Sequence, residues 1–229
     1  STAFLEALAP VVGLTSLAMA EAATQAQAAG LLAGSEFAHD LVRETLVQRA
    51  APAVRRAMHA GIARHAQAQL GAHALAGQWW AAGREDEAVA QTELAAALDR
   101  SRGLLEPALA LLESALARTA DAARQARLHS LLAATHFQAG DNEAAARWVA
   151  ATLAGAPGPQ ARLEALFVQA ELALATGHIG DAERLVQQVL AIDATAGDSV
   201  MLAAHIASLN GDFARAEALL ERLRSERQH

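Results

Sequence analysis

Apolar and polar residues recur along this chain with the spacing of helices, and only one short segment departs from it. Residues 16–29 predict the first long helix. Thr15 or Ser16 is placed to be its N-cap, because a side-chain oxygen there can accept a hydrogen bond from an unpaired backbone N–H. Gly30 follows the last helical residue, as glycine commonly does. The pattern therefore predicts a largely helical protein from its first element.

Two further helices are predicted before residue 72. Asp40 opens a helix over 40–50, since an acidic residue in the first turn suits the positive end of the helix dipole. Pro52 stands at the first position of a helix over 52–70, where its missing N–H costs nothing. At spacings of four and eight residues, one side of this helix carries Val54, Met58, Ile62 and Leu70.

The segment 31–37 interrupts the helical pattern. Two short runs that contain apolar residues are joined by Gly34 and Ser35, a link typical of a tight II′ hairpin. A helix, a small hairpin and another helix make a winged-helix-like arrangement. We therefore expect a winged-helix-like domain over residues 1–72.

From residue 73 to residue 229 the chain predicts helices that repeat. Five glycines each have an alanine seven residues before and another five residues after: Gly83, Gly103, Gly140, Gly177 and Gly211, with Ala76, Ala96, Ala133, Ala170 and Ala204 before and Ala88, Ala108, Ala145, Ala182 and Ala216 after. The last three spacings between the glycines are 37, 37 and 34 residues. This pattern resembles the tetratricopeptide repeat (TPR), a helix pair of about 34 residues in which small residues let the two helices approach.

The first spacing, 20 residues, is too short for a full repeat. One helix at about 85–101 is therefore expected to be the second helix of one pair and the first helix of the next. The predicted fold class is all-α: a winged-helix-like N-terminal domain with a small β-hairpin, followed by a TPR-like α-α superhelix over 73–229.

Each predicted pair must stack on its neighbour to bury its apolar face. Where they are buried, truncation of Leu132, Leu166 or Leu219 is expected to cost roughly 2 to 5 kcal/mol. Enlarging Ala145 or Ala182 is expected to overpack the core at a cost of roughly 1 to 3 kcal/mol.

Composition excludes several kinds of chemistry. All 18 basic residues are arginine, so the chain has no Gly-Lys-Ser/Thr phosphate-binding loop and no lysine for Schiff-base chemistry. Cysteine is also absent, which excludes disulfides and thiolate metal sites and fits a reducing compartment. We expect a cytoplasmic location.

Charge and hydropathy also limit the possible partners. The part before residue 74 has five acidic residues and five arginines, and the remainder accounts for the net charge of −7. An acidic surface repels phosphate backbones, so no direct nucleic-acid contact is expected. The longest uncharged stretch near the start, Ala7–Ala20, is shorter than the roughly 20 apolar residues of a membrane span and lacks the basic region of a signal peptide. No membrane partner is predicted.

Three segments, "FAHDLVRETL", "VRRAMHAGIARH" and "ALAGQWWAAGREDEAV", resemble the winged-helix-to-TPR junction of the STAND signal-transduction ATPases. These include bacterial transcriptional regulators of the LuxR and maltose-activator type. The resemblance spans most of the chain and is strongest over 31–88. In that superfamily the histidine of a Met-His-Asp motif contacts the β-phosphate of bound ADP. The matching residues here are Ala38, His39 and Asp40, so the methionine is replaced.

The resemblance implies that His39 takes part in cofactor binding, with ADP or ATP held by an upstream ATPase domain of the full-length protein. No cofactor is expected in this chain alone, which has no initiator methionine and is expected to be a fragment. An imidazole N–H and a helix N-terminus both suit an anionic phosphate. The other interpretation, that His39 caps the helix or packs against Phe37, stays open.

Other candidate sites have weaker support. The pairs His59 and His65, and His129 and His136, lack the i, i+4 spacing and the carboxylates of a metal site. The tryptophans, Trp79, Trp80 and Trp148, fall at packing positions of predicted helices. No Gly-x-Ser-x-Gly elbow occurs. We therefore expect no metal site, no catalytic residue and no enzyme.

The concave face of a helical solenoid is where partners bind. The first helix of each predicted pair places the following residues there: Arg127, Phe137, Glu164, Phe167, Glu171, Met201 and His205. These apolar and charged side chains could hold a protein or small-molecule effector. Phe137 and Phe167 could instead close gaps between helices. The lysine-based carboxylate clamp of chaperone TPR domains cannot form here.

The function predicted is that of a non-catalytic regulatory or sensor fragment of a larger STAND-type transcriptional regulator, which mediates autoinhibition and effector binding. The alternative is a free-standing TPR adaptor that scaffolds protein partners.

Overall fold

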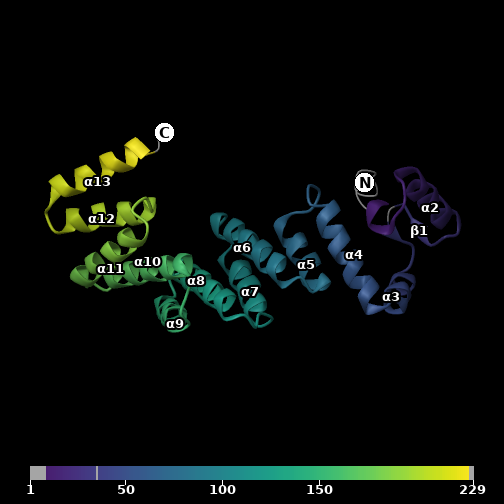
Figure 1. The fold of residues 1–229 in the computed structure, drawn as a ribbon, viewed down its shortest axis with the longest axis horizontal. Coiled ribbons are helices and arrows are strands. Elements are labelled where there is room, and N and C mark those ends of the chain that lie inside the picture. The colour runs from purple at the N-terminus through teal and green to yellow at the C-terminus, as the bar shows by residue number, and fades with distance from the viewer. Residues whose placement is uncertain (1–8, 35, 227–229) are drawn as a thin grey trace. The chain divides into compact units, whose positions relative to one another are not determined.

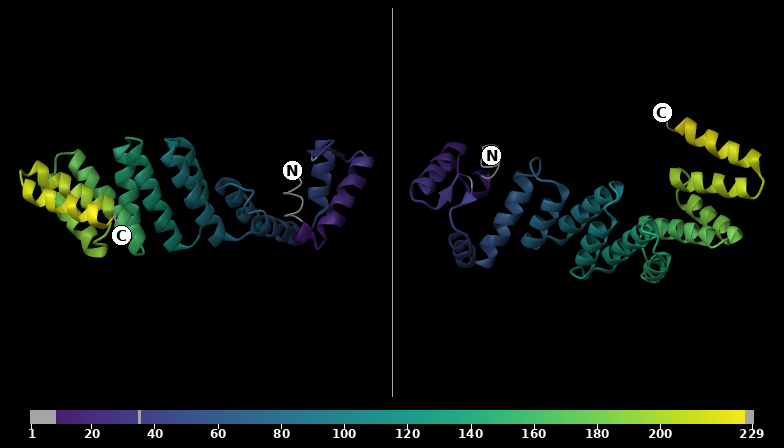
Figure 2. Two further views of the ribbon diagram at one scale, coloured as in Figure 1. Left: turned by 90° about the horizontal axis from the view of Figure 1, so that it is seen from above. Right: turned by 180° about the vertical axis from the view of Figure 1, so that it is seen from behind.

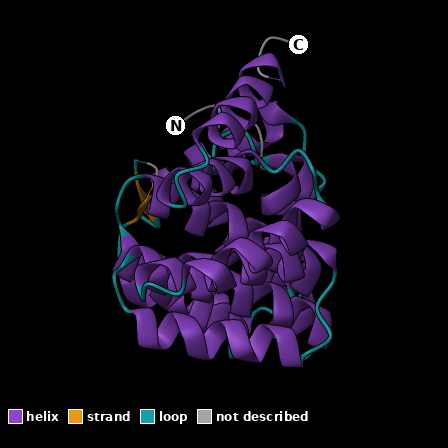
Figure 3. Cartoon of the chain, turned by 90° about the vertical axis from the view of Figure 1, so that its left-hand side faces the viewer, coloured by secondary structure: helices purple, strands orange, loops and turns teal. Residues whose placement is uncertain are grey.

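The computed structural model describes residues 9–34 and 36–226, and most of them are helical (Figures 1 and 3). In chain order the elements are a 3-10 helix η1 (Ala9–Val12), α2 (Ser16–Ala28), β1 (Leu32–Ala33), β2 (Glu36–Phe37), α3 (Asp40–Arg49), α4 (Pro52–His65), α5 (Ala72–Ala82), α6 (Glu85–Ser101), α7 (Leu105–Leu116), α8 (Ala122–Gln138), α9 (Asn142–Ala154), α10 (Pro159–Ala175), α11 (Ile179–Ile192), α12 (Gly197–Leu209) and α13 (Phe213–Glu226). None of the described helices is both long and apolar enough to cross a membrane.

The chain forms two compact units, Ser1–Ala95 (unit 1) and Ala96–His229 (unit 2). The division falls within α6. The domain boundary predicted between residues 72 and 73 lies inside unit 1, at the start of α5, and stays a prediction.

Unit 1 begins with the helix and hairpin that the sequence predicts. Thr15 is the N-cap of α2, and its Oγ1 accepts a hydrogen bond of 3.2 Å from the Ala18 N–H. Strands β1 and β2 pair antiparallel, with Leu32 opposite Phe37. The hairpin is thus confirmed. Gly34 has φ +67°, as a II′ turn requires at its first position, but Ser35 lies outside the described residues and the turn type stays a prediction.

Helix α4 starts at Pro52 as predicted but ends at His65, not at residue 70. The chain turns there because α5 starts at Ala72 and packs back on α4. The apolar side of α4 is also not its buried side: Val54 and Met58 are exposed, whereas the buried residues are Ala60, Gly61 and Ala63. The small residues are buried because η1 packs closely on α4, and a Cβ at position 61 would overlap the side chain of Val11.

Unit 2 is a stack of antiparallel helix pairs, which lie side by side in Figure 2. Helices α8 and α9 form one pair, α10 and α11 the next, and α12 and α13 the last. Between pairs, α10 packs on both α8 and α9, and α11 packs on α12. Each pair therefore completes the core of its neighbour, as a helical repeat requires.

The repeat pattern of the sequence is confirmed by burial and backbone conformation. All ten alanines of the pattern are buried, none more than 7% exposed. The five glycines all have positive φ, between +70° and +81°, and each lies in the turn between two helices. Helix α6 spans most of the short interval between Gly83 and Gly103, as the 20-residue spacing predicts.

The interiors of the pairs are aliphatic. Around Ala133 and Ala145 of α8 and α9, one cluster gathers Val149 and Val168, with Trp148 and Leu172 at its margin. A second cluster is built on Ala170, Ala182, Val186, Leu202 and Ile206. Of the three leucines expected to be buried, Leu132 is fully buried, Leu166 is buried and Leu219 is half-buried.

The left-handed turn at Gly177 can be tested by substitution. We expect Gly177→Ala to lower the free energy of unfolding by about 1 kcal/mol, because its φ of +81° is unfavourable for a residue with a Cβ. Gly180→Ala is the matched control: it lies in the first turn of α11 with open space around its Cβ position, so helix propensity alone predicts a gain of up to about 1 kcal/mol. Urea unfolding of both variants measures the difference. Equal effects of the two substitutions would contradict the role given to the turn.

Candidate functional site

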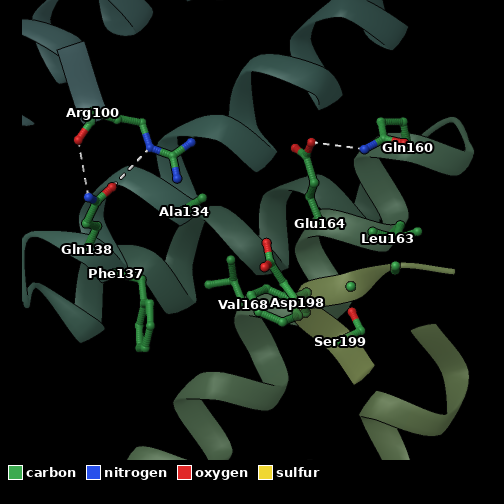
Figure 4. Close-up of a pocket in the computed structure, with 13 residues that line it drawn as sticks. Arg100, Ala134, Phe137, Gln138, Gln160, Leu163, Glu164, Val168, Asp198 and Ser199 are labelled. Carbon is green, nitrogen blue, oxygen red and sulfur yellow. Dashed lines mark hydrogen bonds between the residues drawn. The ribbon is translucent and has the colours of Figure 1, made fainter. Parts of the chain in front are cut away.

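Unit 2 contains an open cavity of about 470 Å³ (Figure 4). Its walls come from the end of α6 and from α8, α10 and α12, the first helices of successive pairs. Three of the seven residues predicted for a binding face line it: Phe137, Glu164 and Phe167. The cavity also includes two charged residues that the prediction did not include, Arg100 and Asp198.

The charged residues of the site recur at fixed distances from the turn glycines. Arg127, Glu164 and Asp198 each lie 13 residues before the turn glycine of their own pair, and Arg100 and Phe137 each lie three residues before theirs. Equivalent positions of stacked repeats lie next to one another along the stack. One row of the site is therefore made of Arg127, Glu164 and Asp198 in that order.

Glu164 is held by several neighbours. Its Oε1 lies 2.5 Å from Nη1 of Arg127 in an ion pair and accepts a 3.2 Å hydrogen bond from Nε2 of Gln160. Its Oε2 accepts a 2.9 Å hydrogen bond from Oγ of Ser130. The negative charge of Glu164 is thus matched by Arg127 within the protein.

Arg100 is half-buried at the edge of the cavity. Its Nε donates a 3.2 Å hydrogen bond to Oε1 of Gln138, and Nε2 of Gln138 donates one of 3.4 Å back to the Arg100 carbonyl, as Figure 4 shows. Burial lowers the pKa of Arg100; the negative charge of Glu164 acts in the opposite direction, and the positive charge of Arg127 lowers it further. The protein therefore places a partly desolvated cation beside the cavity.

The aromatic residues have two roles in this geometry. Phe137 packs against the cluster around Ala133 and Val149, and Phe167 packs against the cluster around Val186 and Leu202. Both also line the cavity. They fill the spaces between helices, as one of the two interpretations of the sequence had it, and they give the cavity apolar walls at the same time.

No protein-family model and no curated protein sequence matches the chain. Solved structures do. The MamA protein superposes with a TM-score of 0.52 at 11% identity, covering 76% of this chain and 92% of that one. BtubC (BKLC) from P. vanneervenii superposes with a TM-score of 0.55 at 18% identity, covering 81% and 85%. Both are TPR-like helical-repeat proteins.

This chain has a TPR-like fold. At these identities the likeness concerns the fold alone. It agrees with the buried alanines and left-handed glycines of the repeat, which come from the chain itself. The TPR-like stack explains why side chains from four helices, α6, α8, α10 and α12, line one cavity.

The remaining predicted residues of the TPR-like unit lie further along the helices. Glu171 on α10 is half-buried, while Met201 and His205 on α12 are exposed. Burial raises the pKa of Glu171; the charge of His205 opposes this shift and the charge of Asp198 adds to it. The charges of His205 and Asp198 on α12 therefore act on Glu171 of α10.

The raised pKa of Glu171 has a consequence for stability. Below its ordinary pKa of 4.5 the carboxyl is neutral in both states, and as the pH rises through the raised pKa the folded state must ionise a half-buried group. We therefore expect Glu171→Gln to gain unfolding free energy relative to the unsubstituted protein between about pH 4 and about pH 7.

Urea unfolding at the two pH values measures this difference. The exposed Glu217, whose Gln variant should show no such trend, is the control. If the unfolding free energies of Glu171→Gln and of the unsubstituted protein differ by the same amount at both pH values, ionising the half-buried carboxyl of Glu171 does not destabilise the folded state.

In unit 1, His39 is exposed and is the N-cap residue of α3. Its side chain makes no capping hydrogen bond, and Asp40 in the first turn forms a 3.5 Å ion pair with Arg43. Phe37 is exposed as well.

Three of the histidines considered as metal ligands each lie beside a polar or aromatic neighbour. Nδ1 of His59 lies 2.7 Å from Oε1 of Gln78, and Nδ1 of His136 lies 3.5 Å from Oδ2 of Asp141. The ring of His129 lies 5.1 Å from that of Trp148, and burial lowers the pKa of His129. Over residues 9–34 and 36–226, no three His, Cys, Asp or Glu side chains converge as metal ligands would.

The tryptophans lie at packing positions, half-buried on their helices. Nε1 of Trp80 donates a 3.3 Å hydrogen bond to Oγ1 of Thr92 within unit 1. Trp148 packs at the margin of the cluster around Ala145.

Arg100 and Asp198 are the site residues that the sequence interpretation missed, although the repeat contains the signal for both. Each occupies a repeat position already assigned to the face in another pair: Arg100 that of Phe137, and Asp198 that of Arg127 and Glu164. Applying the register to every pair, including the helix at about 85–101 that was predicted to belong to two pairs, would have found them.

Proposed function

We propose that this chain is a non-catalytic regulatory module whose TPR-like unit binds a protein partner or small effector in the cavity of unit 2. The observation that carries the proposal is the cavity itself, which three successive helix pairs line with apolar and charged side chains. Stacked repeats commonly bind extended segments in this way, because each repeat contributes side chains at a regular interval.

The finer proposal places this module in a cytoplasmic STAND-type ATPase transcriptional regulator of the LuxR or maltose-activator type. Its support is the order of elements in unit 1, where α2, the hairpin and α3 follow one another as in a winged helix, ahead of the TPR-like repeats. The ADP or ATP would be bound by an upstream ATPase domain, and the chain described here would supply His39.

The surroundings of His39 support this role. Its ring is exposed and makes no capping hydrogen bond to α3. The backbone N–H of Val42 donates to the His39 carbonyl, which leaves the N–H groups of Asp40 and Leu41 at this N-terminus for an acceptor. An imidazole N–H beside such a helix N-terminus suits an anionic phosphate.

Regulation would then follow from coupling between two sites. ADP contacting His39 stabilises an inactive arrangement, and an effector in the cavity stabilises an active one. By linkage, the factor by which the effector weakens ADP binding is the factor by which ADP weakens effector binding.

A free-standing adaptor is the second candidate, and the same cavity supports it. An adaptor needs no nucleotide, so the two candidates differ in what the gene encodes before this segment. Sequencing the flanking gene distinguishes them: a region encoding Walker A and Walker B motifs upstream supports the regulator.

His39→Ala in the full-length protein tests the regulator directly. We expect ADP affinity to fall about ten-fold, the value of a hydrogen bond to a charged group, and basal activity to rise. Calorimetric titration with ADP measures the affinity, and His65→Ala, an exposed histidine on α4, is the matched control. Unchanged ADP affinity in His39→Ala would count against the regulator.

A further inference from the structure

We propose that the cavity of unit 2 selects a partner peptide that presents a carboxylate to Arg100, with an apolar side chain beside it against the wall formed by Phe137 and Val168. This inference rests on the proposed function, since it assumes that a partner binds in this cavity, and it adds the chemistry by which the partner is recognised.

The guanidinium of Arg100 has unused hydrogen-bond donors. Its Nε is occupied by Gln138, but no described residue accepts a hydrogen bond from Nη1 or Nη2. These two nitrogens belong to a half-buried side chain that lines the cavity. A guanidinium edge with free donors matches the two oxygens of a carboxylate, and the orientation of this edge is fixed beforehand by the bond to Gln138.

Glu164 does not accept a hydrogen bond from Arg100. Although its charge acts on Arg100, the two side chains form no ion pair. The carboxylate of Glu164 is instead bound by Arg127, Ser130 and Gln160. Arg127 therefore neutralises Glu164, and among the described residues no carboxylate forms an ion pair with Arg100.

The cavity also has apolar walls. Phe137, Leu163 and Val168 are among the residues that give the cavity an apolar lining, in which a charge-assisted hydrogen bond is stronger than in bulk water. Figure 4 shows Arg100 and Phe137 both lining the cavity, one from α6 and the other from α8. Asp198, at the start of α12, repels a carboxylate and so favours its placement at Arg100.

The size of the cavity fits one or two side chains of a peptide. Its volume of about 470 Å³ lies within the roughly 300 to 1,000 Å³ of ligand pockets. An acidic residue next to an apolar residue, such as Asp-Leu or Glu-Phe, supplies the anion and the apolar group together. The partner is therefore an acidic-apolar peptide segment.

A positional-scanning library of hexapeptides capped at both ends tests the proposal on the chain as it stands. The capped termini leave side-chain carboxylates as the acidic groups. We expect the protein to prefer Asp or Glu over Asn or Gln about ten-fold at one position, next to a position that prefers Leu, Ile or Phe.

Three variants identify the residue responsible. Arg100→Gln should reduce that preference to less than about three-fold, while Arg100→Lys, which keeps the charge, should retain part of it. Arg102→Gln is the matched control, because Arg102 is exposed, lies two residues away and does not line the cavity. Circular dichroism and thermal unfolding of each variant establish that it is folded.

The outcomes separate this inference from the proposed function. Acidic selection that is lost in Arg100→Gln and kept in Arg102→Gln supports the inference. Peptide selection without an acidic preference, or an acidic preference that survives in folded Arg100→Gln, overturns the inference and leaves partner binding in place. If no hexapeptide is selected at all, peptide binding in this cavity is overturned together with the inference.

Discussion

Leu132→Ala is expected to lower the free energy of unfolding by about 2 to 5 kcal/mol. Leu132 lies on α8 and is fully buried. The substitution removes the apolar side chain and leaves a cavity that the surrounding helices can close only in part. Because α8 packs on α7, α9 and α10, the loss should destabilise more than one helix pair. Urea unfolding followed by circular dichroism measures the effect.

The control is Leu209→Ala on α12, where the leucine is 51% exposed. The same atoms are removed there from a surface, so a change within about 0.5 kcal/mol is expected. If the two variants lose similar amounts of stability, then α8 does not lie at the centre of a packed stack.

Ala145→Leu is expected to lower the free energy of unfolding by about 1 to 3 kcal/mol, because it overfills the core instead of leaving a cavity. Ala145 lies on α9, is fully buried and belongs to the cluster with Ala133 and Val168. A larger side chain at this position must push α8 and α9 apart, since packed interiors have no room for extra methylene groups.

Ala146→Leu provides a control one residue away, on the exposed side of the same helix. Alanine and leucine differ little in helix propensity, so this variant should unfold within about 0.5 kcal/mol of the unsubstituted protein. Comparing the urea unfolding of Ala145→Leu with that of Ala146→Leu isolates the effect of burial, because the same side chain is introduced at a buried and at an exposed position. A stable Ala145→Leu variant would mean that the approach of the two helices does not depend on a small residue.

The repeat could be predicted from the sequence because small residues and turn glycines are constrained where helices meet. The five glycines adopt positive φ, which other residues rarely do, so their spacing revealed the turns before the helices were known. The hairpin between residues 31 and 37 was predictable for the same reason, since Gly34 is a turn residue.

Helix α4 shows where sequence patterns were insufficient. Its apolar residues suggested one side, but the burial follows the small residues on another, because η1 and α5 pack there. The helix ends at His65 for a reason that lies in this packing and not in a local breaker. Tertiary contacts of this kind override local propensity and cannot be seen along the chain.

The sequence predicted only part of the candidate site. Phe137, Glu164 and Phe167 line the cavity because the repeat register places the first helix of each pair along it. The ion pair of Arg127 with Glu164 and the free donors of Arg100 depend on side-chain conformations, which the register does not specify.

The separation between core and cavity positions within each repeat determines how the protein can change. The alanines next to the turns hold the helices together, while the row of Arg127, Glu164 and Asp198 uses other positions of the same helices. A substitution at Asp198 alters the charge at one point of the cavity without touching these alanines, whereas one at Arg127 or Glu164 also removes an ion pair between α8 and α10. Ligand preference in this protein can therefore change at Asp198 with little loss of stability, while a change at Arg127 or Glu164 has to be matched by its partner.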